Sequence, residues 1–256
     1  MTAGAVAHVA PGDAAPPAPG TRLGGRYRLD RLVARGGVGA IWRAVDEATQ
    51  EVVAVKLAHP STQDVDAVAR LQHEARMLAH LAGSHVVGCR DDGTHAGTGY
   101  LVLDYLGGRN LAQVLAAGAS VASWGVARAV ARALAAVHAR GGVHGDLKPQ
   151  HVMLSDDRAI PVTLVDFGEA SADGEPPGTC GPRATPAYLA PEVAAGARRS
   201  PASDLFALGV LLERLPDAGG RASGAAQWTA LVERLIALDP DARGTAAEAA
   251  AALVTP

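Results

Sequence analysis

HGDLKPQH at residues 144–151, followed by VDFG at residues 165–168, decides the interpretation of this sequence. Asp146 lies two residues before Lys148. A carboxylate that can accept a hydroxyl proton therefore has an ammonium group nearby that can balance negative charge. Asp166 follows a short apolar run, so its carboxylate would stand at a strand end and suit a hard divalent cation. Either aspartate alone is also compatible with an ordinary turn.

The bulk composition excludes several classes of protein. The 256 residues are 48% hydrophobic with a net charge of −3, which fits one large domain or two lobes and predicts no nucleic-acid partner. Cys89 and Cys180 match no metal or redox spacing, so we expect a reduced, cytoplasmic setting. We predict a disordered Ala/Pro-rich leader at residues 1–22, and no apolar run suits a membrane span.

Lysine usage is unusual. Among 23 lysines and arginines, only Lys56 and Lys148 are lysines. A composition rich in Ala, Arg and Gly accounts for the scarcity of lysine but does not account for these two. A compact ammonium group at a phosphate is not replaced by a planar guanidinium. Both lysines are therefore candidates for phosphate contacts, although they could be leftover surface residues.

The order of predicted elements divides the chain near residues 104–109. Apolar alternation and helical periodicity predict five strands and one helix before this point, at 27–34, 40–46, 51–57, 64–82 (the helix), 85–91 and 100–106. After it we predict helices at 110–118, 122–140, 202–214, 227–238 and 245–253, with short strands at 151–154 and 162–165. Residues 216–226, which are mostly small, are expected to form a short connection between two of these helices.

A glycine turn and a lysine lie in the strand-rich part. Gly36, Gly37 and Gly39 join two predicted strands, and backbone without side chains can offer N–H groups to phosphates. Most such runs are ordinary hairpin turns. Lys56 ends the strand VAVK, and Glu74 in the following helix could pair with it and aim it at phosphate oxygens. The alternative for Glu74 is a solvated helix face.

The glycine turn, VAVK, the helical glutamate, HGDLKP, VDFG and TPAYLAPE (185–192) occur in this order. The set resembles the eukaryotic-type (Hanks-type) bacterial Ser/Thr protein kinase domain over about residues 26–254. The resemblance implies an α+β, bilobal protein-kinase-like fold. A small, mostly-β N-lobe with one helix would span about 23–106, and a larger, mostly-α C-lobe would span about 107–256.

The resemblance also implies roles for individual residues, with ATP and Mg²⁺ or Mn²⁺ as cofactors and a protein as substrate. Asp146 would be the catalytic base, Lys148 would contact the γ-phosphate, and Thr185 would bond to both, which indicates a Ser or Thr acceptor. ATP binding would involve Gly36, Gly37, Gly39, Ile41, Ala54, Lys56, Glu74, Asp104, Leu106 and Met153. Asp166 and His151 would bind the metal. Asp204, and the pair Glu192 and Arg243, would be structural, and Leu78, His144 and Phe167 would form a packing column.

Two departures from the family pattern lie in the opening motif. Gly145 replaces an arginine that normally grips a phosphate on the activation segment, so we expect activity that does not depend on phosphorylation of Ser171 or Thr179. His151 replaces an asparagine that ligates metal. A neutral imidazole has one donor and one acceptor, favours Mn²⁺ over Mg²⁺, and ordinarily gains a proton near pH 6.5, so acid should weaken metal binding.

Two other functions remain open. A pseudokinase that binds nucleotide or acts as a scaffold is consistent with Gly145 and His151. A small-molecule phosphotransferase is suggested by the HGD triplet, but such enzymes usually lack the TPAYLAPE segment. No sensor domain is evident, so we expect any regulation to come from a protein acting in trans.

Overall fold

The computed structural model describes residues 17–36, 39–58, 67–83, 85–155, 162–172, 185–216 and 222–253. It forms two compact units: Met1–Ala75 with Cys89–Tyr105, and Arg76–Gly88 with Leu106–Pro256. Helix α1 (Ala67–His80) contains the first of these divisions. Among the helices of the described residues, none has the length and apolar character needed to cross a bilayer.

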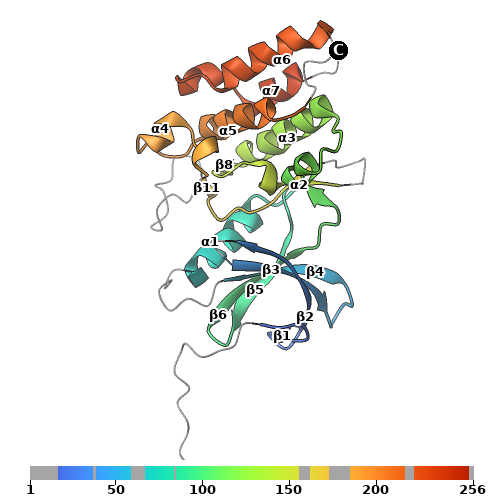
Figure 1. Cartoon of the computed structure of the whole chain (residues 1–256). Coiled ribbons are helices and arrows are strands. Elements are labelled where there is room, and N and C mark those ends of the chain that lie inside the picture. Colours follow the sequence, from blue (N-terminus) through green and yellow to red (C-terminus); the bar gives the residue numbers. More distant parts are fainter. Residues whose placement is uncertain are drawn as a thin grey trace, which may run out of the picture. The chain divides into compact units, whose positions relative to one another are not determined.

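The first unit is built on a six-stranded antiparallel sheet, in the order β1-β2-β3-β4-β6-β5 (Figure 1). Its strands are β1 (Arg22–Leu23), β2 (Tyr27–Gly36), β3 (Gly39–Asp46), β4 (Val52–Ala58), β5 (Cys89–His95) and β6 (Thr98–Asp104). One face is apolar because alternate residues of each strand point to the same side. The buried residues on this face form an apolar core, which includes Val53, Val55 and Leu57 of β4.

The glycine turn between β2 and β3 requires its glycine at position 39. Gly36 pairs with Gly39 at the end of the hairpin. Gly39 has a φ of +155°, and a Cβ there would lie 1.8 Å from the carbonyl oxygen of Leu57 on β4. Any side chain at Gly39 would therefore push β3 away from β4, the strand that carries Lys56.

Two predictions for the first unit are wrong in their boundaries. The strand expected at 85–91 starts at Cys89 and continues to His95. Val86 and Val87, which suggested the earlier start, belong to the second unit, where the Val87 N–H donates to Leu164 (3.1 Å). Residues 1–16 of the predicted leader lie outside the described residues. Its last residues are structured, since Gly20 donates to Leu29 (2.8 Å) and Arg22 is in β1.

The second unit is mainly helical (Figure 1). Its helices are α2 (Leu111–Ala116), α3 (Ser123–His138), α4 (Pro191–Ala194), α5 (Pro201–Glu213), α6 (Ala222–Leu235) and α7 (Ala246–Ala252), with 3₁₀ turns η1 (Pro149–His151), η2 (Pro186–Tyr188) and η3 (Pro240–Arg243). Its strands are β7 (Arg109–Asn110), β8 (Gly142–Val143), β9 (Val152–Leu154), β10 (Val162–Leu164) and β11 (Ser171–Ala172). Strands β10, β9 and β7 form one sheet, and β11 pairs with β8.

Helices α3 and α5 organise this unit. Helix α3 packs against α5, α7 and β10, and α5 also packs against α6. Ser200 caps α5 with a reciprocal pair of hydrogen bonds to Ser203, which fixes where the helix begins. Helix α6 begins at Ala222 instead of residue 227, so part of the predicted connection belongs to the helix. The small residues there fit a helix as well as a loop.

Candidate active site

Lys56 and Glu74 form a buried ion pair in the first unit. Lys56 Nζ lies 2.7 Å from Glu74 Oε2, and the two side chains are only 8% and 2% exposed. Strand β4 holds the lysine in register between Ile41 of β3 and Leu101 of β6, and the glutamate comes from α1. The ion pair holds the ammonium group in one direction. It is hard to break, because loss of one member would leave the other charge buried.

The other residues predicted to bind ATP are distributed over both units. The first unit contains Gly36, Gly39, Ile41, Ala54 and Asp104, and the second contains Leu106 and Met153, whereas Gly37 lies outside the described residues. Ile41 is paired with Lys56, and Ala54 with Leu103. Asp104 ends β6 and its carboxylate accepts a hydrogen bond from Arg90 (2.6 Å).

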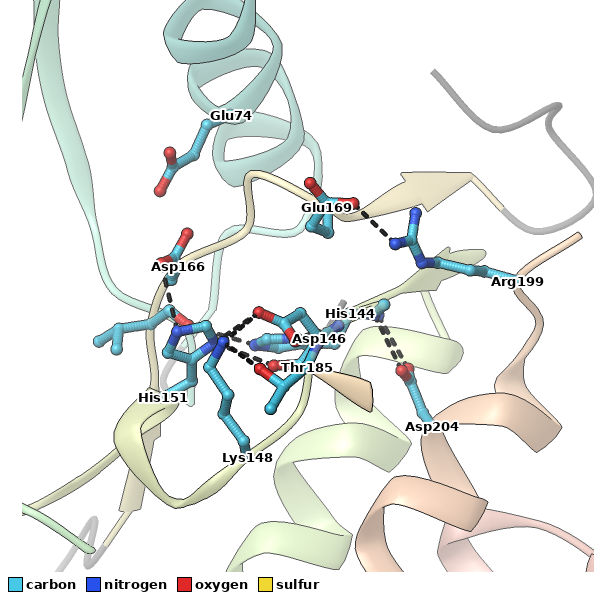
Figure 2. Close-up of polar contacts among 12 residues, drawn as sticks. Glu74, His144, Asp146, Lys148, His151, Asp166, Glu169, Thr185, Arg199 and Asp204 are labelled. Atoms are coloured by element: carbon cyan, nitrogen blue, oxygen red, sulfur yellow. Dashed lines mark hydrogen bonds and ion pairs between the residues drawn. The ribbon is translucent and has the colours of Figure 1, made fainter. Parts of the chain in front are cut away.

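Asp146 and Lys148, from the loop between β8 and η1, meet Thr185, which directly precedes η2 (Figure 2). Lys148 Nζ donates to Asp146 Oδ2 at 2.6 Å and to Thr185 Oγ1 at 2.9 Å. The backbone N–H of Thr185 donates to the other oxygen of Asp146 at 3.3 Å. Lys148 thus bridges a carboxylate and a hydroxyl that lie 39 residues apart in sequence. The arrangement can hold a carboxylate as a proton acceptor beside a fixed positive charge.

The backbone of this loop is anchored on Asp204 of α5. Its carboxylate accepts hydrogen bonds from the N–H groups of His144 (2.8 Å) and Gly145 (2.9 Å), and it lies 2.9 Å from His138 Nε2. Burial would raise the pKa of Asp204, but the hydrogen bonds from His138 and Gly145 outweigh it and lower this pKa overall. Asp204 therefore stays charged and holds the loop that presents Asp146.

His144 supports Asp146 as a neutral ring. Its Nε2 lies 3.2 Å from the carbonyl oxygen of Val165, which can only accept, so Nε2 carries the proton. Its Nδ1 then accepts the Asp146 N–H at 3.3 Å. Burial lowers the pKa of His144, in agreement with a neutral ring. The ring packs on Phe167 with centroids 4.6 Å apart, and Leu78, the third member of the predicted column, is also buried.

His151 links the two aspartates. Its Nδ1 lies 2.9 Å from the backbone carbonyl of Asp146, so Nδ1 donates. In the neutral ring Nε2 is then a lone-pair donor, and it lies 3.2 Å from Asp166 Oδ2 (Figure 2). With a protonated ring this contact is an ion pair, whereas with a neutral ring both atoms are lone-pair donors that can bind one cation together. Ligands at right angles on one Mg²⁺ are about 3 Å apart, since each lies about 2.1 Å from the ion.

This donor set fits a divalent cation that also binds phosphate. Within the described ranges no group of three or more His, Cys, Asp or Glu side chains forms a closed metal site. A pair of protein ligands is nevertheless what Mg²⁺ uses when substrate phosphates and waters complete its shell. Asp166 has a φ of +64°, a left-handed conformation that is uncommon for aspartate and occurs often at functional sites.

A second buried ion pair stabilises the helical unit away from this loop. Arg243 is fully buried and donates to both oxygens of Glu192, at 2.7 and 2.8 Å. It also donates to the carbonyl oxygens of Ala202 and Ala237, each at 2.9 Å. The structure therefore ties α4, α5 and η3 together through one guanidinium group.

The protein kinase domain family matches residues 27–217 of this chain. The chain belongs to this family. The predicted family and the α+β protein kinase fold are thereby confirmed.

Bacterial relatives extend the comparison of this kinase domain. Serine/threonine-protein kinase PknA of Mycobacterium tuberculosis is 37% identical over 206 residues, which are 76% of this chain and 47% of that protein. Serine/threonine-protein kinase pkn3 of Myxococcus xanthus is 34% identical over 212 residues, 77% of this chain and 38% of pkn3. A probable serine/threonine-protein kinase of Clostridium acetobutylicum is 32% identical over 199 residues, which are 75% of this chain and 30% of that protein. The chain thus spans less than half the length of these relatives.

Sequence reasoning missed two contributors to the kinase domain. His138 at the end of α3 joins the anchor on Asp204. Arg199 lies 2.7 Å from Glu169, the residue that follows VDFG. The sequence does show a histidine at the end of an amphipathic helix and a charged residue directly after VDFG. Neither pattern names its partner, because the partners are tens of residues away in sequence.

Proposed function

We propose that the chain transfers the γ-phosphoryl group of ATP to serine or threonine hydroxyls of proteins. The observation that carries this proposal is Lys148 bridging Asp146 and Thr185. This contact supports the proposal because it brings a carboxylate, an ammonium group and a hydroxyl together, as the proposed reaction requires. The relatives' names as serine/threonine-protein kinases support the same assignment.

The proposed mechanism assigns each group one task. Asp146 accepts the proton of the attacking hydroxyl, and Lys148 balances the charge that develops on the transferred group. Lys56, aimed by Glu74, binds the α- and β-phosphates. Asp166 and His151 would hold the divalent cation, which neutralises phosphate charge when bound. Positioning and electrostatics supply most of the acceleration in such reactions.

A pseudokinase is the second candidate. Gly145 and His151 favour it, because both replace groups that the family pattern uses for activation and metal binding. Under this alternative the chain would bind ATP without transferring phosphate. A thermal shift produced by ATP with metal would then occur without any phosphoryl transfer.

The deciding assay follows label from γ-³²P-ATP into casein and into the chain itself, with Mg²⁺ and with Mn²⁺. We expect incorporation by the wild type, and loss of at least a hundredfold in Asp146→Asn and Asp166→Asn. Asp92→Asn, an exposed aspartate on β5, is the matched control and should remain active. Label on phosphoserine or phosphothreonine is the expected product. Nucleotide binding with no incorporation in either metal would establish the pseudokinase instead.

We also propose that activity does not require a phosphorylated activation segment. Ser171 lies in β11, opposite Val143 of β8, and Thr179 lies outside the described residues. Ser171→Ala, Thr179→Ala and phosphatase-treated wild type should all keep activity within about twofold of the untreated protein. A large loss in any one of them would contradict this part of the proposal. The cytoplasmic location and the regulator in trans remain predictions.

A further inference from the structure

Gly145 leaves no room for the side chain that it replaces. Its φ is +79°, where only glycine is relaxed. A Cβ at this position would lie 2.4 Å from the carbonyl oxygen of Glu169 and 2.8 Å from Cδ of Arg199. The space beside this loop is therefore already filled, by the backbone of Glu169 and by another arginine, Arg199.

That arginine is buried and paired. The Arg199 side chain is only 9% exposed, and its Nη2 lies 2.7 Å from Oε2 of Glu169, which is 19% exposed (Figure 2). Arg199 directly precedes Ser200, the N-cap of α5, where the helix dipole disfavours a positive charge. The positive charge of Arg199 therefore does not stabilise helix α5. Its contact with Glu169 accounts for a buried arginine at this position.

Glu169 belongs to the segment that carries the candidate metal ligand. The N–H of Ala170 donates to the carbonyl of Phe167 (3.1 Å), which closes a tight turn directly after Asp166. Ser171 then pairs with Val143 of β8, two residues before Gly145. The segment is held against the catalytic loop by this short ladder and by the ion pair.

We propose that the Arg199–Glu169 pair is a permanent latch that replaces the usual contact between a loop arginine and an activating phosphate. Glu169 supplies the negative charge without phosphorylation, and Arg199 supplies the guanidinium group that position 145 lacks. Both are positioning residues, because they act through the turn that sets the backbone of Asp166. The proposal rests on the proposed function for the role of Asp166, but the latch itself concerns the segment 167–172.

The first test measures the latch without activity. Hydrogen exchange of the amides of 167–172 is compared in wild type, Arg199→Ala, Glu169→Gln and the adjacent exposed control Arg198→Ala. We expect exchange in this segment to rise at least tenfold in Arg199→Ala and Glu169→Gln, with the amides of α3 unchanged. A rise no greater than that of Arg198→Ala, or an equal rise across α3, would overturn the latch.

The second test links the latch to Asp166. The Mn²⁺ concentration that gives half of the ATP-induced thermal shift should rise at least fivefold in Glu169→Gln, while the shift by ATP without metal stays unchanged. Arg199→Glu combined with Glu169→Arg should recover part of the lost metal affinity. An unchanged metal requirement in Glu169→Gln, or no recovery in the double variant, would remove the positioning role. If the wild type transfers no phosphate but both tests give the expected results, the proposed function fails and the latch stands.

Discussion

Replacing His151 tests whether an imidazole serves as a metal ligand in this kinase domain. His151→Phe keeps a ring beside His144, whose centroid lies 6.0 Å away, and removes both nitrogens. His151→Asn instead restores the residue of the family pattern. The two variants separate loss of the ligand from exchange of the ligand.

The expected magnitudes follow from the two contacts of the ring. Loss of the Nδ1 hydrogen bond to the Asp146 carbonyl at 2.9 Å should cost about 1 kcal/mol in the free energy of unfolding. Loss of Nε2, 3.2 Å from Asp166 Oδ2, should raise the half-saturating metal concentration at least tenfold, or about 1.4 kcal/mol. In His151→Asn the ratio of Mn²⁺ to Mg²⁺ affinity should fall, because an amide oxygen is a harder ligand than imidazole.

The assay titrates MgCl₂ or MnCl₂ at saturating ATP and follows the melting temperature, with phosphoryl transfer measured in parallel. Lys148 and Thr185 stay intact in both variants, so a lost catalytic group cannot explain the result. An unchanged half-saturating Mn²⁺ concentration in His151→Phe would refute the ligand assignment. So would an unchanged metal preference in His151→Asn.

Three further predictions concern stability. The pKa of His144 is lowered in the folded state, so the unfolded chain binds more protons below about pH 6.5. The free energy of unfolding, measured with urea, should therefore fall there by up to about 1.4 kcal/mol for each pH unit of acidification. His144→Gln should remove this slope. Glu192→Gln leaves Arg243 buried with a neutral partner and should lower the free energy of unfolding by about 3–5 kcal/mol in the same assay. Gly145→Ala should cost more than about 1 kcal/mol, because its Cβ meets the Glu169 carbonyl; an unchanged urea midpoint would contradict this expectation.

Local patterns were enough to predict most of the architecture. The alternation of VAVK and the helical spacing around Glu74 predicted β4 and α1, and the resemblance supplied the family. The predictions of strand boundaries failed where one sequence pattern was compatible with two structures. Val86 and Val87 have the character of a strand but lie in the second unit, where Val87 bonds to Leu164, whereas the polar run of β5 gives little apolar signal. Two-residue strands such as β8 and β11 are too short for any periodicity.

Contacts within the site were harder to predict than its members. Lys148 and Thr185 were placed together only through the resemblance, because no local rule relates residues so far apart. The contact of Arg199 could not be predicted for the same reason. Its neighbour Arg198 is also an arginine, but it is exposed. Burial separates the two arginines, and burial at this point depends on how α5 begins relative to the catalytic loop.

The two altered positions of the loop therefore have different physical meanings. At position 145 the arginine is absent, but a guanidinium and a carboxylate meet in the adjoining space, so the electrostatic task can be carried out by other residues. At position 151 one nitrogen of the imidazole bonds to the loop and the other faces Asp166, which supports the proposal that it replaces an amide. Both arrangements lie beside an intact Asp146–Lys148–Thr185 contact, and together they support the proposal of an active kinase over a pseudokinase.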